Sequence, residues 1–250
     1  MDWRSRGSRL RIGGHRGARD TAPENTIAGF EAGRASGAEY LENDVRRSAD
    51  GVLVMIHDDT VDRTSNGQGE VARLTLAELQ ALDAGSWFGP SFALEPIPTF
   101  DSFLRWIEAR PPFGAVIEAK AHGVGGEIAE AIARSTARDH LAICSFYPDE
   151  IRAAKRARPE VPCILLFEWR PHEADPIELT RACGADGADL PWPWLDERLA
   201  ARVHDAGLVL GGGTANDERA VGILTDVQAD FVDTDTPRAT VRVRDAAMAR

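Results

Sequence analysis

The sequence lacks several features that mark whole classes of protein. Its 250 residues contain only three cysteines, at positions 144, 163 and 183, and no two of them form a C-x-x-C pair. That spacing indicates neither a disulfide framework nor a thiolate zinc site. The chain also has no apolar run long enough to span a bilayer or to serve as a signal peptide. We therefore expect free thiols, no integral membrane segment and a cytoplasmic location.

Basic charge and two common catalytic motifs are missing as well. The chain carries 29 Lys and Arg against 40 Asp and Glu, a formal net charge of -11. Nucleic acids are held mainly by clustered cations, so we expect no nucleic-acid partner. Neither a G-x-S-x-G elbow nor a P-loop occurs, which leaves serine-hydrolase and nucleoside-triphosphate chemistry without support. An acidic protein can still bind an anionic phosphodiester where a metal ion and a few cations reverse the potential in one cleft.

Short apolar segments alternate with longer, Ala-rich and charged segments. This alternation predicts repeated strand and helix units around a parallel sheet. The expected strands are residues 10–14, 39–44, 115–118, 141–145, 163–167, 186–190, 208–211 and 231–233. The expected helices are residues 127–138, 149–158, 177–183, 195–206 and 218–224. Eight strands predict an α/β protein, a TIM (β/α)8 barrel formed by residues 1–250 as one domain.

One segment, about residues 46–98, breaks this alternation. Asp50 and Gly51 predict a hairpin turn, residues 52–57 an extended arm, and residues 74–82 a short helix. We therefore expect a small inserted subdomain between strands 2 and 3, on one face of the barrel.

Three carboxylates fall at the ends of predicted neighbouring strands. Glu42 and Asp44 are two residues apart, so in a strand both point to the same face, where they repel each other. Glu118 closes the next strand, and three oxygen donors suit Mg²⁺ or Ca²⁺ better than zinc. An E-x-D pair by itself is more often a solvated strand end. The third carboxylate favours a site for one divalent cation.

Two histidines and two cations follow strands at the same end of the barrel. His15 lies in a Gly-Gly-His-Arg-Gly segment, and His57 precedes two aspartates. Each could have a structural role, but two histidines beside one phosphoryl group would supply a base and an acid. Arg16 can bind two phosphate oxygens, and Lys120 can neutralise charge unless it is a surface lysine. Residues 22–26 most simply open the first helix, with Asn25 or Thr26 as its cap.

Five motifs, in their order and spacing, closely resemble the glycerophosphodiester phosphodiesterase family. They are HRGARDTAPENT at residues 15–26, LENDV at 41–45, DGVLVMIHDDTVDRTSNGQG at 50–69, IPTF at 97–100 and IEAK at 117–120. A weaker likeness continues through residues 145–146 and 214–216 to 234–237. The resemblance implies a TIM barrel with an insertion between its second and third strands.

The same resemblance implies roles for the candidate residues. Glu42, Asp44 and Glu118 would hold the metal, and His15 and His57 would be the acid/base pair. Arg16 and Lys120 would bind phosphate. The substrate would be a small glycerophosphodiester, and the products glycerol 3-phosphate and an alcohol.

One departure from the family pattern concerns the substrate more than the chemistry. Members commonly carry a W-T-x-N motif after the seventh strand, and the aromatic position here is Gly213. An aromatic side chain at this position would give the glycerol backbone of the substrate an apolar wall. The candidates to replace it are Trp169, Trp192 and Trp194. An alternative function is therefore a phosphodiesterase that acts on lysophospholipids or another bulky diester. Gly213 favours it, as do three aromatic residues in the insertion, Trp87, Phe88 and Phe92. A barrel that binds phosphodiesters without cleaving them is a third hypothesis.

Overall fold

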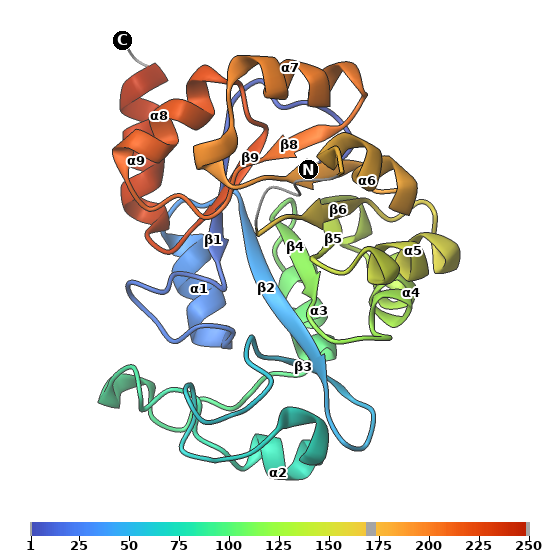
Figure 1. Cartoon of the computed structure of the whole chain (residues 1–250). Helices are drawn as coiled ribbons and strands as arrows, with labels where there is room; N and C mark the ends of the chain where they lie inside the picture. The colour runs from blue at the N-terminus through green and yellow to red at the C-terminus, as the bar shows by residue number, and fades with distance from the viewer. Residues whose placement is uncertain (1, 169–173, 249–250) are drawn as a thin grey trace.

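The computed structural model describes residues 2–168 and 174–248, and a closed ring of parallel strands forms its centre (Figure 1). The strands of the ring are β1 (Arg11–His15), β2 (Tyr40–Arg47), β4 (Gly114–Ala119), β5 (Leu141–Ser145), β6 (Cys163–Leu166), β7 (Gly187–Asp189), β8 (Val209–Gly211) and β9 (Phe231–Thr234). They follow one another in chain order, and β1 closes the ring by pairing with both β2 and β9. The predicted TIM barrel is therefore confirmed, with β3 (Leu53–Met55) as an extra strand antiparallel to β2.

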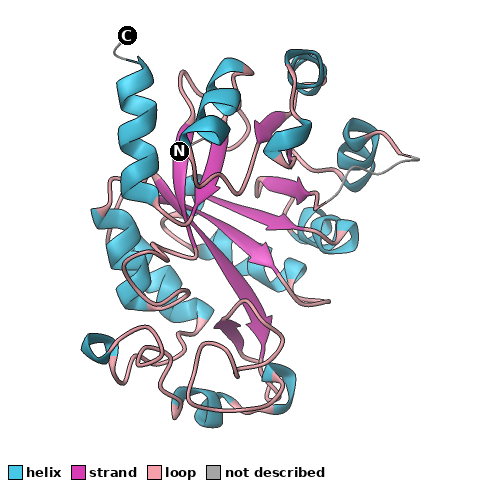
Figure 2. Cartoon of the chain, turned by 60° about the vertical axis from the view of Figure 1, so that its left-hand side comes forward, coloured by secondary structure: helices cyan, strands magenta, loops and turns pink. Residues whose placement is uncertain are grey.

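Helices connect successive strands and cover the outside of the barrel (Figure 2). They are α1 (Ile27–Ala35), α3 (Phe100–Glu108), α4 (Gly125–Arg134), α5 (Pro148–Ala157), α6 (Pro176–Cys183), α7 (Glu197–Asp205), α8 (Glu218–Asp226) and α9 (Pro237–Met248). Thr26 caps α1, since its side chain accepts a hydrogen bond from the Gly29 amide. Within residues 2–168 and 174–248, no helix is both long and apolar enough to cross a membrane.

Two of the predicted helix boundaries are wrong for local reasons. Helix α4 ends at Arg134 rather than at residue 138, because Ser135 turns to extended backbone and donates its hydroxyl to Glu108. Helix α7 begins at Glu197 rather than at residue 195, because the Asp196 side chain accepts from the Leu199 amide and caps it. The patterns left α3 and α9 unpredicted.

Aromatic side chains fill the amino-terminal half of the barrel interior. Trp3 packs edge-on against Tyr40 and Phe231, with ring centroids 4.9 and 5.8 Å apart. All three rings are almost fully buried. Because this end is packed, space for a ligand remains at the carboxyl ends of the strands, where barrels of this kind carry their sites.

The segment between β2 and α3 includes β3 and lies beside the carboxyl end of β2 (Figure 1). It contains η1 (Val71–Arg73), α2 (Leu76–Gln80) and η2 (Pro90–Phe92). Gly51 turns the β2–β3 hairpin with a φ of 86°, at the predicted turn. A small apolar cluster of its own holds the segment together: Val54, Ile56, Val61, Val71, Leu79, Ala84 and Ile97.

Candidate active site

The structure brings all seven predicted site residues to one place at the carboxyl end of the barrel. Six of them line a cavity of about 210 Å³: His15, Arg16, Glu42, His57, Glu118 and Lys120. The seventh, Asp44, is wholly buried within the same group. Strand pairing explains why these residues lie close together, because His15 is in register with Glu42, and Asp44 with Glu118.

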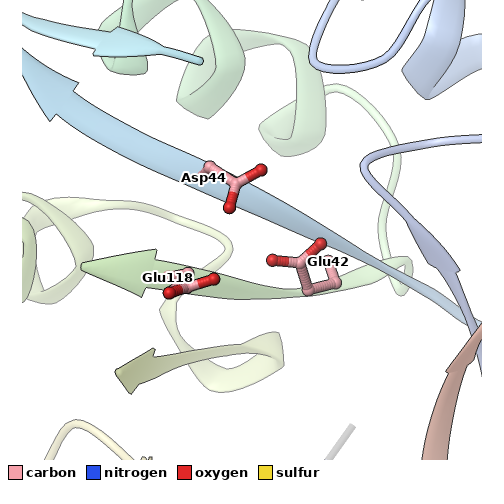
Figure 3. Close-up of side chains that lie close together, drawn as sticks. All are labelled: Glu42, Asp44 and Glu118. Carbon is pink, nitrogen blue, oxygen red and sulfur yellow. The ribbon is translucent and has the colours of Figure 1, made fainter. Parts of the chain in front are cut away.

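The three carboxylates form one buried cluster on two adjacent strands. Figure 3 shows Glu42 and Asp44 on β2 and Glu118 on β4. One oxygen of each lies within 4.8 Å of the others. Asp44 Oδ1 is buried and has no hydrogen-bond partner, while Asp44 Oδ2 accepts from the Asn25 amide at 2.7 Å. The donor set and the free oxygen fit a hard divalent cation.

The charges in the cluster are unbalanced. Burial and the charge of Asp44 raise the pKa of Glu118 to about 8. Burial and the same neighbour also raise the pKa of Glu42 well above its usual value. Burial acts the same way on Asp44, but the charges of Arg16 and Lys120 outweigh it and lower the pKa to about 2. Without added positive charge, the three groups are not all ionised at neutral pH.

Both cations of the site are already engaged with carboxylates. The Arg16 guanidinium donates to Glu24 at 2.9 Å, and its Nε lies 3.3 Å from Asp44 Oδ2. The Lys120 ammonium donates to Glu118 at 3.0 Å and lies 3.7 Å from Asp44 Oδ1. Both side chains nevertheless border the cavity, so each can also meet an anion there.

An aspartate orients each histidine. His15 Nδ1 lies 2.7 Å from Asp235 Oδ1, and His57 Nδ1 lies 2.6 Å from Asp58 Oδ1. With Nδ1 occupied, each ring keeps Nε2 for a ligand. Burial lowers the pKa of His57, against the charge of Asp44 and the hydrogen bond with Asp58, which both raise it.

The two aspartates are tied together through one glutamate. Arg19 donates to Asp235 at 2.7 Å and to Glu24 at 3.2 Å. Arg63 donates to Asp58 at 2.7 Å and to Glu24 at 2.8 Å. Glu24 therefore joins the supports of both histidines.

Sequence reasoning missed this supporting layer. The sequence predicts that Glu24 lies in the segment that opens the first helix and that Asn25 or Thr26 caps it, yet Asn25 has a φ of 55° and holds Asp44, and Thr26 is the cap. Asp58 and Asp235 belong to motifs that carried the resemblance, but neither was given a role. For Asp58 the available signal was its position directly after His57, whereas nothing in the sequence placed Asp235 beside His15.

A Glu24→Gln change should destabilise the protein by about 2 to 3 kcal/mol at pH 7. This loss of stability is smaller than that expected for breaking a fully buried ion pair, because Arg19 and Arg63, which pair with Glu24, are partly exposed. Burial alone would raise the pKa of Glu24, but hydrogen bonds from Arg63 and Arg16 lower it to about 2. An unfolded glutamate titrates near about 4.3. The stabilisation is therefore fully present above that value and is lost as the pH falls toward 2.

Urea unfolding at several pH values would measure this difference, with Glu218→Gln on the exposed face of α8 as the control. The Glu24 variant should approach the wild type as the pH is lowered. An equal difference at pH 7 and pH 3 would contradict the ion-pair role.

The rest of the cavity wall carries both apolar side chains and the carboxylates of Glu168, Asp189 and Asp233. Phe146, Ile164, Leu166 and Phe167 line it. Trp192 and Trp194 form η4 (Trp192–Trp194) and are not among the lining residues that the structure describes, so they do not replace the missing aromatic wall. Trp169 lies outside the described residues.

Comparisons with known proteins show the family of this chain. The model of the glycerophosphoryl diester phosphodiesterase family matches residues 15–239. A glycerophosphodiester phosphodiesterase of Caldanaerobacter subterraneus subsp. tengcongensis is 35% identical over 207 residues, covering 74% of this chain and 84% of that protein. The chain belongs to the glycerophosphoryl diester phosphodiesterase family.

Solved structures of similar proteins have the same fold. A phosphodiesterase of Oleispira antarctica, in complex with the product sn-glycerol-3-phosphate, has a TM-score of 0.86 and 29% identity, covering 94% of this chain and 96% of that one. A glycerophosphodiester phosphodiesterase from Agrobacterium tumefaciens has a TM-score of 0.82 and 27% identity, covering 93% and 99%.

Proposed function

We propose that this chain hydrolyses glycerophosphodiesters to glycerol 3-phosphate and an alcohol, and that residues 1–250 act as one domain. The observation that carries the proposal is the buried carboxylate cluster flanked by two histidines, each oriented by an aspartate. The Oleispira antarctica structure with sn-glycerol-3-phosphate supports the identity of the phosphorylated product.

Glu42, Asp44 and Glu118 would hold one divalent cation, Mg²⁺ or Ca²⁺. Their oxygen donors, and Asp44 Oδ1, which accepts no hydrogen bond, fit such an ion. When bound, the cation would offset the charge of the carboxylates and polarise a phosphoryl oxygen. Arg16 and Lys120, at the same wall of the cavity, would bind and orient the phosphate.

The histidines would move the protons. One Nε2 takes a proton from the attacking oxygen, and the other gives a proton to the oxygen of the departing alcohol. Asp58 and Asp235 hold Nδ1 of each ring and so leave Nε2 for the reaction, and His15 Nε2 lies 3.9 Å from Glu42.

The size of the cavity favours a small diester over a lysophospholipid. About 210 Å³ suits a compact substrate, and Trp87, Phe88 and Phe92 are not among the described residues that line it. A binding protein without activity would be expected to lack a histidine or a metal ligand, and this chain retains all five.

Phosphorus NMR during incubation with glycerophosphoethanolamine and Mg²⁺ or Ca²⁺ tests the proposal. The expected product is glycerol 3-phosphate. A cyclic phosphate that forms first would indicate attack by a substrate hydroxyl, and its absence throughout would indicate attack by water. Release of phosphoethanolamine and glycerol, or no reaction with either metal, would contradict the proposal.

A further inference from the structure

One arginine of the insertion stands between Asp58 and the buried Glu24. Nε of Arg63 donates to Asp58 Oδ2 at 2.7 Å, and Nη2 donates to Asp58 Oδ1 at 3.0 Å. Nη1 and Nη2 also donate to the two oxygens of Glu24, at 2.9 and 2.8 Å. The planar guanidinium thus holds two carboxylates at once in a fixed geometry, which a lysine ammonium does not reproduce.

The Asp58 carboxylate depends on this arginine for its orientation. Among the residues that the structure describes, its side-chain partners are the His57 ring and Arg63. The oxygen that meets His57 Nδ1 is itself held by Arg63. The hydrogen bonds from Arg63 also lower the pKa of Asp58 well below its usual value, so the carboxylate stays ionised at neutral pH. Without Arg63, Asp58 would be free to rotate, and so would the ring that it holds.

The backbone of His57 is held separately from its ring. The Arg46 side chain donates to the His57 carbonyl at 2.8 Å. The Ile56 amide donates to the Asp44 carbonyl at 3.1 Å, and the apolar cluster of the insertion packs behind this segment. Loss of the Arg63 side chain should therefore leave the insertion folded and release the ring alone.

The support of His15 differs from this arrangement. Arg19 donates to Asp235 Oδ1 at 2.7 Å, but Asn216 holds the same aspartate from its other side. The Asn216 amide donates to Asp235 Oδ2 at 2.8 Å, and its oxygen accepts from the Asp235 backbone amide at 2.8 Å. In the described part of the chain, Asp58 has no counterpart of Asn216. The histidine of the insertion is therefore the one that depends more strongly on its arginine.

Glu24 fixes Arg63 in turn. The Glu24 side chain is 3% exposed and belongs to the loop between β1 and α1, whereas Arg63 belongs to the insertion. Their ion pair ties the insertion to the barrel. His15 comes from the barrel and His57 from the insertion, so this tie also sets the position of one histidine relative to the other.

We propose that Arg63 is a positioning residue for the reaction: anchored by Glu24, it holds Asp58 in the orientation that fixes the His57 ring. The proposal rests on the function proposed above and gives the insertion a part in the chemistry. Arg63 is not among the described residues that line the cavity, so it acts through Asp58 and not on the substrate. Its loss should therefore affect turnover more than substrate binding.

Arg63→Ala should lower kcat on glycerophosphoethanolamine, at saturating metal, by at least about tenfold and change KM by less than about threefold. Arg73→Ala is the matched control, because Arg73 lies in the same insertion and its side chain is 79% exposed. It should retain wild-type kcat and KM. Wild-type kcat in Arg63→Ala, or a loss expressed mainly in KM, would overturn the proposal.

Arg19→Ala tests the difference between the two supports. Its kcat should fall at least about threefold less than that of Arg63→Ala, because Asn216 still holds Asp235. An equal or larger loss in Arg19→Ala would contradict the special dependence of Asp58 on Arg63.

A double-mutant cycle tests whether Arg63 acts through Asp58. In an Asp58→Ala background, Arg63→Ala should lower kcat by less than about threefold more, since the carboxylate that it positions is already gone. The same loss in both backgrounds would show that Arg63 acts by another route and would exclude the proposed role.

An NMR measurement separates this proposal from the proposed function. In protein labelled with ¹⁵N-histidine, the Nδ1 and Nε2 shifts of His57, assigned by their loss in His57→Ala, report the hydrogen bond and tautomer of the ring. They should change in Arg63→Ala, while the shifts of His15 stay and show that the variant is folded. If no diester is cleaved, the proposed function fails, and these spectra still decide the role of Arg63. Unchanged His57 shifts in Arg63→Ala would refute it.

Discussion

Replacing His57 with alanine should lower kcat on a glycerophosphodiester by about 10²- to 10⁴-fold, the usual contribution of a positioned acid or base. Its ring borders the cavity, and Asp58 at 2.6 Å fixes Nδ1 so that Nε2 is left for the reaction. His15→Ala should have an effect of the same size, since Asp235 holds that ring in the same way.

Steady-state rates with saturating metal would measure both losses. His122→Ala is the control, because the His122 side chain is 78% exposed and lies outside the cavity lining. It should retain wild-type kcat. A loss of less than about tenfold in His57→Ala would count against the acid/base role.

Replacing Glu118 with glutamine should weaken the binding of Mg²⁺ or Ca²⁺ by at least about 10- to 100-fold, since changes to groups that only support a ligand already cost that much. The amide keeps the shape of the side chain but removes one of three anionic donors. Folding should survive, because burial and Asp44 already hold the pKa of Glu118 at about 8 and glutamine mimics the protonated group.

Calorimetric titration with each metal would measure the loss of affinity, independently of turnover. Asp149→Asn is the control, because the Asp149 side chain is 86% exposed on α5. Its metal affinity should equal that of the wild type. Wild-type affinity in Glu118→Gln would exclude Glu118 as a ligand.

Much of the barrel could be predicted from the sequence because buried parallel strands are continuous apolar runs. Strands β5 and β6, for example, read as Leu-Ala-Ile-Cys-Ser and Cys-Ile-Leu-Leu. Helix ends were less predictable, since they depend on single contacts such as the one between Ser135 and Glu108. Those contacts join residues that are far apart in sequence.

The candidate site could also be predicted only in part. Glu42 and Asp44 could be predicted as a pair because a strand repeats every two residues. The support of His15 by Asp235 could not be predicted from spacing, because 220 residues separate them and only closure of the ring brings β9 beside β1.

The central claim is that a divalent cation in the Glu42, Asp44 and Glu118 cluster is needed for phosphodiester cleavage. Its most direct test is the rate of glycerol 3-phosphate release after EDTA treatment, with Mg²⁺ or Ca²⁺ then added back. We predict that EDTA abolishes the activity and that at least one of the two metals restores it. Unchanged activity in EDTA, or activity that neither metal restores, would contradict the account.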